Sequence, residues 1–262
     1  MTHTLNEQQM ERYSRHLILK EVEVEGQLKL LNSKVLIIGT GGLGSPIALY
    51  LAAAGIGTIG IADFDTVDLS NLQRQVIHST ENIGVDKVQS AKNEMIKINP
   101  DITVNAMKTY VNSDNIIDII KDYDFIVDAT DNFASKFLIN DACVLSGKPF
   151  SHGGILRFNG QTMTIKPGEA ACYRCVFTKP LEKNLSTACS KAGVLGSVAG
   201  MLGTIQATEV LKFIIGKGEL LTNKLLTFNS LTMDFRKITI KKNDDCPVCG
   251  KHPTITKPLD EE

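Results

Sequence analysis

Short apolar runs alternate with longer, partly apolar segments through the first 155 residues of the chain. A β-branched run at 35–38 ends in glycines, and an apolar segment follows at 47–54, which together predict a strand, a turn and a helix. The same pattern predicts further strands at 59–62, 102–107, 125–127 and 149–151, and helices at 85–98, 113–120 and 135–145. Repeated alternation of this kind predicts right-handed βαβ units, and hence a Rossmann-like, doubly wound α/β fold with a mostly parallel sheet.

The two ends of the chain differ from this central part. Residues 5–31 carry apolar positions at helical spacing and predict helices ahead of the sheet. Segments 161–166, 224–228 and 235–241 alternate like antiparallel strands, and 193–215 predicts one long apolar helix. We therefore expect a single domain over 1–262, made of an N-terminal helical segment (1–32), a Rossmann-like part (33–155) and a C-terminal part (156–262).

The composition is that of an ordinary globular protein. The chain has 262 residues, 43% of them hydrophobic and 22% charged, which is enough to bury a sizeable core. A net charge of −1 gives no electrostatic argument for a nucleic-acid or anionic-membrane partner. The polar N-terminus and the absence of 18 unbroken apolar residues argue against export and membrane spanning. We therefore expect a cytoplasmic protein with neither nucleic-acid nor membrane partners.

A glycine-rich turn follows the first predicted strand. It fits G-x-G-x-x-G and contains Gly39, Gly41, Gly42 and Gly44. Between a strand and a helix, such a turn directs backbone amides and the helix dipole at a phosphate. Asp63 ends the second strand, where a carboxylate can bond ribose hydroxyls. Nucleotide binding is therefore predicted, with NAD, FAD, SAM and ATP as open candidates and a turn without a ligand as the alternative. No P-loop motif is present.

Four of the six cysteines form two C-x-x-C pairs, Cys172 with Cys175 and Cys246 with Cys249. In a reducing compartment such pairs favour metal ligation over disulfides. The spacing lets one turn present two thiolates to a tetrahedral zinc, and four thiolates leave no open coordination position. We therefore predict one structural Zn²⁺ per chain that joins the distal end of the chain to its middle. A redox C-x-x-C and unligated thiols are the alternatives.

A longer series of polar motifs follows the glycine-rich turn in the sequence. Asp63-Phe64-Asp65 is followed by Ser70-Asn71-Leu72-Gln73-Arg74-Gln75, Lys87 stands near the start of the next predicted helix, and Asp128-Ala129-Thr130-Asp131-Asn132 follows a later strand. From Arg12-Tyr13-Ser14-Arg15 to the second cysteine pair, this series resembles the MoeB/ThiF/HesA adenylyltransferases. These enzymes are similar to the adenylation domain of ubiquitin-activating enzymes.

The resemblance implies an activity. A small ubiquitin-like sulfur carrier that ends in Gly-Gly, of the molybdopterin or thiamine type, would have its C-terminal carboxylate adenylylated by ATP with release of pyrophosphate. Residues 33–155 would bind the nucleotide, and residues 156–262 would bind carrier and zinc. Only 13 residues follow Cys249. We therefore expect no rhodanese-like domain there, and a separate sulfur donor of the desulfurase or rhodanese type.

The resemblance also implies roles for single residues. The residues implied for ATP and Mg²⁺ are Gly39, Gly41, Gly42, Gly44, Asp63, Asp65, Asn71, Arg74, Gln75, Lys87, Asp131 and Asn132. The residues implied for catalysis are Arg15, Arg74, Lys87, Asp131 and Cys189. Positive charge is needed because a carboxylate attacks the α-phosphate, which brings two anions together. Arg15 would be lent to the ATP site of the partner subunit in a homodimer.

Two further residues have competing interpretations, and a third is assigned to the core. Cys189 lies in a polar segment before the long predicted helix, where a thiolate is favoured, and its family counterpart is catalytic in some members and dispensable in others. Cys143 is expected in the core. His152 follows a predicted strand end and either lines the site or is structural.

Three other functions compete with sulfur-carrier adenylylation. They are an NAD(P)-dependent oxidoreductase, an adenylyltransferase for another small protein, a peptide or a tRNA, and an inactive binding module. Loss of turnover when Arg74 or Lys87 is replaced would distinguish an adenylyltransferase from the oxidoreductase, which has no need of these two cations.

Overall fold

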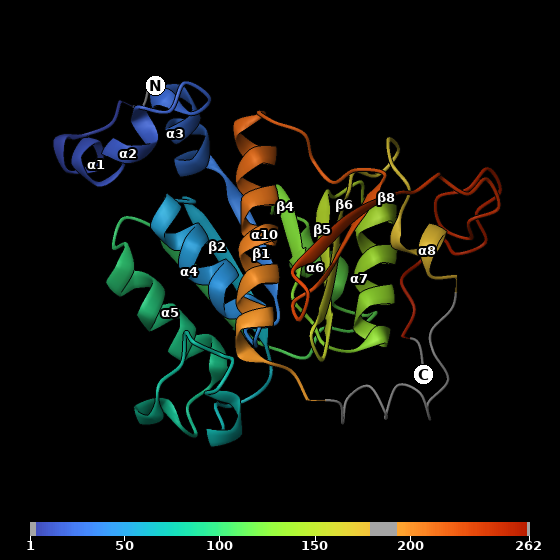
Figure 1. Ribbon diagram of the computed structural model, residues 1–262, viewed down its shortest axis with the longest axis horizontal. Coiled ribbons are helices and arrows are strands. Elements are labelled where there is room, and N and C mark those ends of the chain that lie inside the picture. Colours follow the sequence, from blue (N-terminus) through green and yellow to red (C-terminus); the bar gives the residue numbers. More distant parts are fainter. Residues whose placement is uncertain (1–3, 179–192, 261–262) are drawn as a thin grey trace.

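The computed structural model describes residues 4–178 and 193–260, which form a mixed sheet flanked by helices (Figure 1). Eight strands have the order β3-β2-β1-β4-β5-β6-β7-β8. The strands are β1 (Lys34–Ile38), β2 (Thr58–Asp63), β3 (Thr103–Lys108), β4 (Phe125–Asp128), β5 (Phe150–Leu156), β6 (Asn159–Ile165), β7 (Lys224–Asn229) and β8 (Asp234–Thr239). The α-helices are α1 (Glu7–Arg12), α2 (Ser14–Leu17), α3 (Glu23–Asn32), α4 (Gly44–Ala54), α5 (Lys87–Ile98), α6 (Ile116–Ile120), α7 (Phe133–Leu145), α8 (Tyr173–Val176) and α10 (Gly196–Ile215). Two short 3-10 turns are η1 (Leu69–Asn71) and η2 (Thr80–Asn82).

The sheet has a parallel half and an antiparallel half. Strands β3, β2, β1, β4 and β5 pair in parallel, whereas β5 to β8 form an antiparallel meander. The apolar strands β1 and β4 are almost entirely buried, as parallel strands are when helices cover both faces of the sheet. Strand β8, at the open edge, is exposed along its whole length. The predicted α/β fold with a C-terminal antiparallel extension is therefore confirmed.

Alternate residues of the central strands face two separate cores. Val35 and Ile37 of β1 pack toward α4, α5 and α10, while Leu36 and Ile38 pack toward α6 and α7. Helix α10 lies lengthwise on the first face, against α3, α4, β5 and β6 (Figure 1). Within the described ranges, α10 is long and apolar enough to cross a bilayer, but half of it is buried in the protein. Its contacts make it a core helix.

The order of the strands creates a crevice beside β1. From β1 the sheet continues through β2 and β3 in one direction, and through β4 and β5 in the other. Ligands of such sheets bind where the order reverses, at the carboxyl ends of the strands. Ile38 and Asp128, the last residues of β1 and β4, are paired. The loops that begin at Gly39 and Ala129 therefore leave the sheet together.

Three elements differ from the predictions. Strand β5 extends to Leu156 instead of ending at Ser151, although its Gly-Gly sequence is unfavourable for a strand. Its pairing with β6 along the whole length, from Phe150 to Leu156, outweighs that local preference. The predicted helix at 113–120 is shortened to α6, and the short helix α8 was not predicted.

Candidate functional site

A large cavity opens at the carboxyl ends of β1, β2 and β4 and continues over β5 to β8. Its volume is about 1620 Å³. One end is lined by the glycine-rich turn, Asp63, Arg74 and Lys87, and the other end by residues of the antiparallel strands, among them Gln161 and Arg236. One continuous cavity therefore joins the predicted nucleotide site to an open face of the sheet.

The glycine-rich turn leaves backbone amides free to face this cavity. Helix α4 begins at Gly44, and no side chain caps its first turn. Gly39 has a φ of 96°, and a Cβ there would lie 2.8 Å from the carbonyl oxygen of Ala129, so glycine is required. Uncapped amides and the positive end of the helix dipole form an anion site. Of the four predicted glycines, Gly44 supports the turn but does not line the cavity.

The Asp63 carboxylate is held at the end of β2 by the turn itself. Its Oδ2 accepts hydrogen bonds from the Thr40 amide at 2.8 Å and the Thr40 hydroxyl at 2.9 Å. Its Oδ1 accepts one from the Asp65 amide at 2.9 Å. These bonds fix its orientation while it stays half-buried and lines the cavity. The geometry suits the ribose contact predicted for it.

Two cations line the same end of the cavity. Lys87 is 6% exposed, and its Nζ lies 2.8 Å from Oδ2 of Asp65. Arg74 is half-buried, with its stem beside Gly42 and its guanidinium donating to the Ser70 carbonyl at 3.1 Å. Arg74 therefore stands beside the uncapped amides, and Lys87 lines the same end of the cavity, where phosphate oxygens would be bound.

Four other residues predicted to bind the nucleotide have different surroundings. Gln75 is buried and lines the cavity, and its Oε1 is unpaired. Asn132 caps α7 by accepting a hydrogen bond from the Ser135 amide at 2.8 Å, and it lines the cavity together with Asp131. Asn71 does not line the cavity; its Oδ1 accepts a hydrogen bond from the Asp68 amide at 3.2 Å.

A buried ionic network lies beneath the loop that contains Asp131. Lys136 of α7 lies 3.1 Å from Oδ2 of Asp128 and donates to the Thr130 carbonyl at 2.7 Å. His152 Nδ1 lies 3.0 Å from the same carboxylate oxygen. Burial raises the pKa of Asp128, but the Lys136 charge and the hydrogen bonds from His152 and Thr130 outweigh burial and lower the pKa to about 2. Asp128 is therefore an anion at neutral pH.

The low pKa of Asp128 predicts acid-dependent stability. Its ordinary value is 3.8, so the unfolded chain binds this proton more readily, and the stabilisation present at higher pH is lost as the pH falls toward 2. The Asp128→Asn variant leaves Lys136 buried without its counterion, which should cost about 3–5 kcal/mol at neutral pH. We expect the difference in unfolding free energy between the wild type and this variant, from urea titrations, to narrow by about 2 kcal/mol between about pH 5 and pH 2. A difference that does not change with pH would contradict the assignment.

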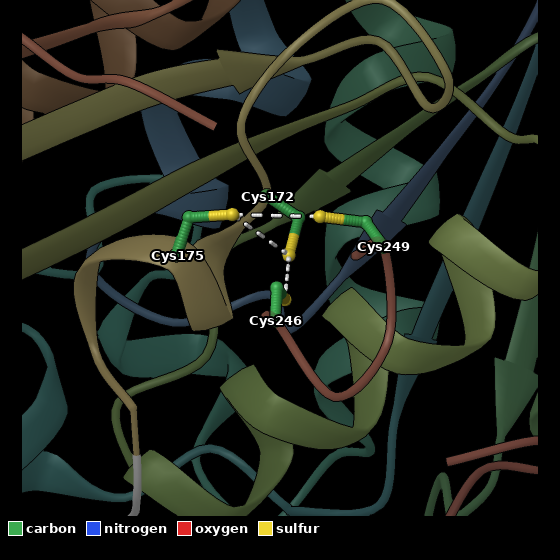
Figure 2. Close-up of side chains that lie close together, drawn as sticks. All are labelled: Cys172, Cys175, Cys246 and Cys249. Carbon is green, nitrogen blue, oxygen red and sulfur yellow. Dashed lines mark hydrogen bonds between the residues drawn. The ribbon is translucent and has the colours of Figure 1, made fainter. Parts of the chain in front are cut away.

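The four predicted zinc ligands meet at one point. Figure 2 shows the sulfurs of Cys172, Cys175, Cys246 and Cys249 turned toward one another, and all four lie within 4.8 Å of each other. The closest pairs are Cys175 with Cys249 at 3.4 Å and Cys172 with Cys246 at 3.5 Å. A tetrahedral zinc with bonds of about 2.3 Å separates its sulfurs by about 3.8 Å. The residues therefore fit a Zn²⁺ ion.

Helix α8 carries one cysteine pair and is anchored to α7. Arg174 donates two hydrogen bonds to Asp141, at 2.8 and 2.7 Å, and stacks over the Phe137 ring at 4.6 Å. The Tyr173 amide donates to Asn140 at 2.8 Å. These buried bonds hold a four-residue helix that has no stability of its own. Contacts with α7 therefore hold Cys172 and Cys175 in place independently of the second cysteine pair.

Comparisons with known proteins agree with this geometry. A match to the ThiF family covers residues 13–248. The chain belongs to the ThiF family. It is 44% identical over 260 residues to the adenylyltransferase and sulfurtransferase MOCS3 of Dictyostelium discoideum, which covers 98% of this chain and 61% of that protein. The chain therefore spans about three-fifths of that relative. The resemblance found in the sequence is confirmed.

Two other proteins match over most of their own length. The SAMP-activating enzyme E1 of Haloferax volcanii is 42% identical over 251 residues, which is 96% of this chain and 93% of that enzyme. The crystal structure of E. coli MccB with MccA-N7isoASN superposes with a TM-score of 0.80 at 27% identity, over 92% of this chain and 74% of that one. Sequence identity and structural superposition therefore agree that this chain has the ThiF fold.

Two residues with roles implied by the ThiF resemblance lie away from the cavity or outside the described ranges. Arg15 is exposed on α2. Tyr13, two residues earlier, packs under Gly55 and accepts a hydrogen bond from Asn99 at 2.9 Å, at the ends of α4 and α5 that lie away from the cavity. Arg15 is therefore remote from the cavity of its own chain. Cys189 lies outside the described residues, and its role stays a prediction.

The ThiF motifs did not reveal every residue around the cavity. Lys136, His152 and Tyr173 all line it. Lys136 has one local signal, because it and Asp141 are the two charged residues of a largely apolar helix. The sequence leaves His152 open between the site and the framework, and the structure places it in both, while Cys143 is buried in the core as predicted.

Proposed function

We propose that this chain adenylylates the C-terminal carboxylate of a small ubiquitin-like sulfur-carrier protein, of the molybdopterin or thiamine type, with ATP as the second substrate. The observation that carries this proposal is the continuous cavity between the glycine-rich turn and the antiparallel strands. It offers one place for a nucleotide and, beside it, room for a polypeptide tail. The names of two relatives, an adenylyltransferase and an activating enzyme, support the same reaction.

The floor of the second part of the cavity is suited to an extended chain. Gly154, Gln161, Thr227 and Arg236 form one cross-strand row on β5 to β8, and all four line the cavity. The neighbouring row at the strand ends consists of Leu156, Asn159, Asn229 and Asp234, which also line it. This surface is mainly polar and has a glycine at its inner end. It therefore suits an extended carrier tail whose C-terminus points toward Asp131.

The proposed chemistry is one displacement at phosphorus. An oxygen of the terminal carboxylate attacks the α-phosphorus, the bond from that phosphorus to the pyrophosphate oxygen breaks, and pyrophosphate leaves with the electron pair. Lys87 and Arg74 would neutralise the phosphate oxygens, and the amides of the glycine-rich turn would hold them in line. Mg²⁺ would be held near Asp131 and would add positive charge at the phosphates. The resulting acyl-adenylate is activated toward a sulfur nucleophile.

A structural zinc and a separate sulfur donor complete the proposal. The four-cysteine cluster would hold one Zn²⁺ that joins α8 to the segment after β8, with no coordination position left for substrate. The sulfur would come from a desulfurase or a rhodanese-type protein.

We also propose a homodimer in which Arg15 reaches the ATP site of the partner subunit. Support comes from the position of Arg15, which is exposed and remote from the cavity of its own chain. Light scattering after size-exclusion chromatography should give about twice the 28.6 kDa of one chain. A strict monomer would refute the shared arginine.

The test of the proposed function is ATP-pyrophosphate exchange with purified carriers of the molybdopterin and thiamine types in turn. We expect exchange with one carrier and none after deletion of its terminal glycine. Exchange with neither carrier would show that the acceptor is of another kind or that the chain is inactive. Titration with NADH under the same conditions should show no binding, which separates this function from that of an oxidoreductase on the same fold.

A further inference from the structure

Two residues that line the cavity each carry a buried polar atom without a hydrogen-bond partner. The atoms are Nε2 of His152 and the hydroxyl of Tyr173, and each residue is only 1% exposed. The two rings are in contact, with centroids 4.5 Å apart. A buried polar atom that lacks a hydrogen bond is costly, and native proteins keep few of them without a reason. A ligand that bonds both atoms would remove that cost.

The surroundings of His152 determine which hydrogen bond Nε2 can make. Asp128 and Lys136 are the charged groups of its network. Nδ1 faces the Asp128 carboxylate, which can only accept, so Nδ1 carries the proton. Burial lowers the pKa of His152 and keeps the ring neutral. Nε2 is therefore a lone-pair acceptor, whereas the Tyr173 hydroxyl can donate.

A glycine lies directly beside Nε2. A Cβ on Gly154 would lie 3.6 Å from Nε2 of His152 and 3.5 Å from Cγ of Gln161. These are ordinary contact distances, and the φ of Gly154 is not positive, so nothing in the backbone demands glycine here. The missing side chain leaves room beside the acceptor atom for the main chain of a ligand.

The pair lies one strand away from the proposed reaction centre. His152 on β5 is paired with Asp128, the last residue of β4, and the loop to Asp131 starts there. Adjacent strands are about 4.8 Å apart. Asp63 and the glycine-rich turn lie beyond β4, on the other side. The acceptor and donor therefore stand where the last residues of the tail would lie, and away from the nucleotide.

We propose that His152 and Tyr173 bind the terminal residue of the acceptor tail, with Nε2 accepting from its N–H and the hydroxyl donating to a carboxylate oxygen on the same side of the extended chain. The inference rests on the proposed function and deepens it, because it assigns the subsite that holds the carboxyl-terminal residue. A residue with no side chain at the end of the tail can pass Gly154 closely. The Asp128 carboxylate acts through His152 by fixing its tautomer.

Three variants test this subsite in the exchange assay. His152→Asn keeps a donor for Asp128 but removes Nε2, Tyr173→Phe removes only an unpaired hydroxyl, and Gly154→Ala puts a methyl group beside Nε2. Each should raise the acceptor concentration for half-maximal exchange by about tenfold, which is the usual effect of losing one buried hydrogen bond. The ATP concentration for half-maximal exchange should not change. Tyr173→Phe should unfold at the same temperature as the wild type or higher. The matched control is Tyr123→Phe, a buried tyrosine that does not line the cavity.

An acceptor with an altered backbone separates binding from general damage. Replacing the terminal glycine by glycolate changes the last amide to an ester, which removes the N–H and keeps the carboxylate. In the wild type, the ester should raise the acceptor concentration for half-maximal exchange by about tenfold. In His152→Asn it should cause no further increase. Wild-type exchange that is unaffected by the three substitutions and by the ester would overturn this inference and leave the proposed function standing. Absence of exchange in the wild type with any acceptor would instead refute the proposed function.

Discussion

Replacement of Lys87 by methionine is expected to lower the rate of ATP-pyrophosphate exchange by about 10²–10³-fold, the size of effect seen when one preorganised charge donor is removed from a transition state. Lys87 is 6% exposed at the base of the nucleotide end of the cavity, and Asp65 is its ion-pair partner. The fold should tolerate the change. Methionine fills a similar volume, and the Asp65 side chain, 47% exposed, remains hydrated.

The control for this variant is Lys108→Met. Lys108 pairs with Asp86 at 2.7 Å, and its side chain is 55% exposed and does not line the cavity. Exchange should stay within about twofold of the wild type, since surface ion pairs contribute little. Thermal unfolding of both variants should match that of the wild type within a few degrees. Near-normal exchange in Lys87→Met would remove this lysine from the proposed phosphate site.

Loss of the four-cysteine site is expected to have the largest effect on stability. Cys172 and Cys246 are buried and belong to the core formed with Met163 and Leu225, so a metal there joins segments that are 74 residues apart. Structural zinc contributes folding free energy directly, and its removal leaves thiols crowded together. We expect Cys246→Ser to lower the melting temperature by about 10 °C or more and to abolish stoichiometric zinc.

Metal analysis and a second cysteine variant check this prediction. The wild type should contain about one zinc per chain, and strong chelators should lower its melting temperature to that of Cys246→Ser. Cys143→Ala is the control, because Cys143 is buried in the same core but is not one of the four clustered cysteines. It should keep its zinc and lose only the packing of one small side chain. Wild-type protein with far less than one zinc per chain, and unaffected by chelators, would refute the metal site.

Much of the fold could be predicted because local patterns and tertiary packing agree in the parallel half. The run at 35–38 is apolar on both faces, which is typical of a central parallel strand, and the structure buries it between two layers of helices. Glycines at 39–44 mark the turn, since Gly39 has a conformation that few other residues adopt. The end of strand β5 could not be predicted from the sequence, because its two glycines stay in the sheet only through their pairing with β6.

The sequence by itself determined the α/β fold, the family, the glycine-rich turn and the identity of the four cysteines, because each of these is written in residue types at short, regular spacing. Only the tertiary structure decided which distant residues meet. Asp128, Lys136 and His152 form one buried network, and Tyr173 comes to lie against His152. No local pattern encodes such contacts, since they depend on the pairing of β4 with β5 and on the packing of α8 against α7. The unpaired atoms of these two cavity-lining residues, and with them the proposed peptide subsite, follow from that packing alone.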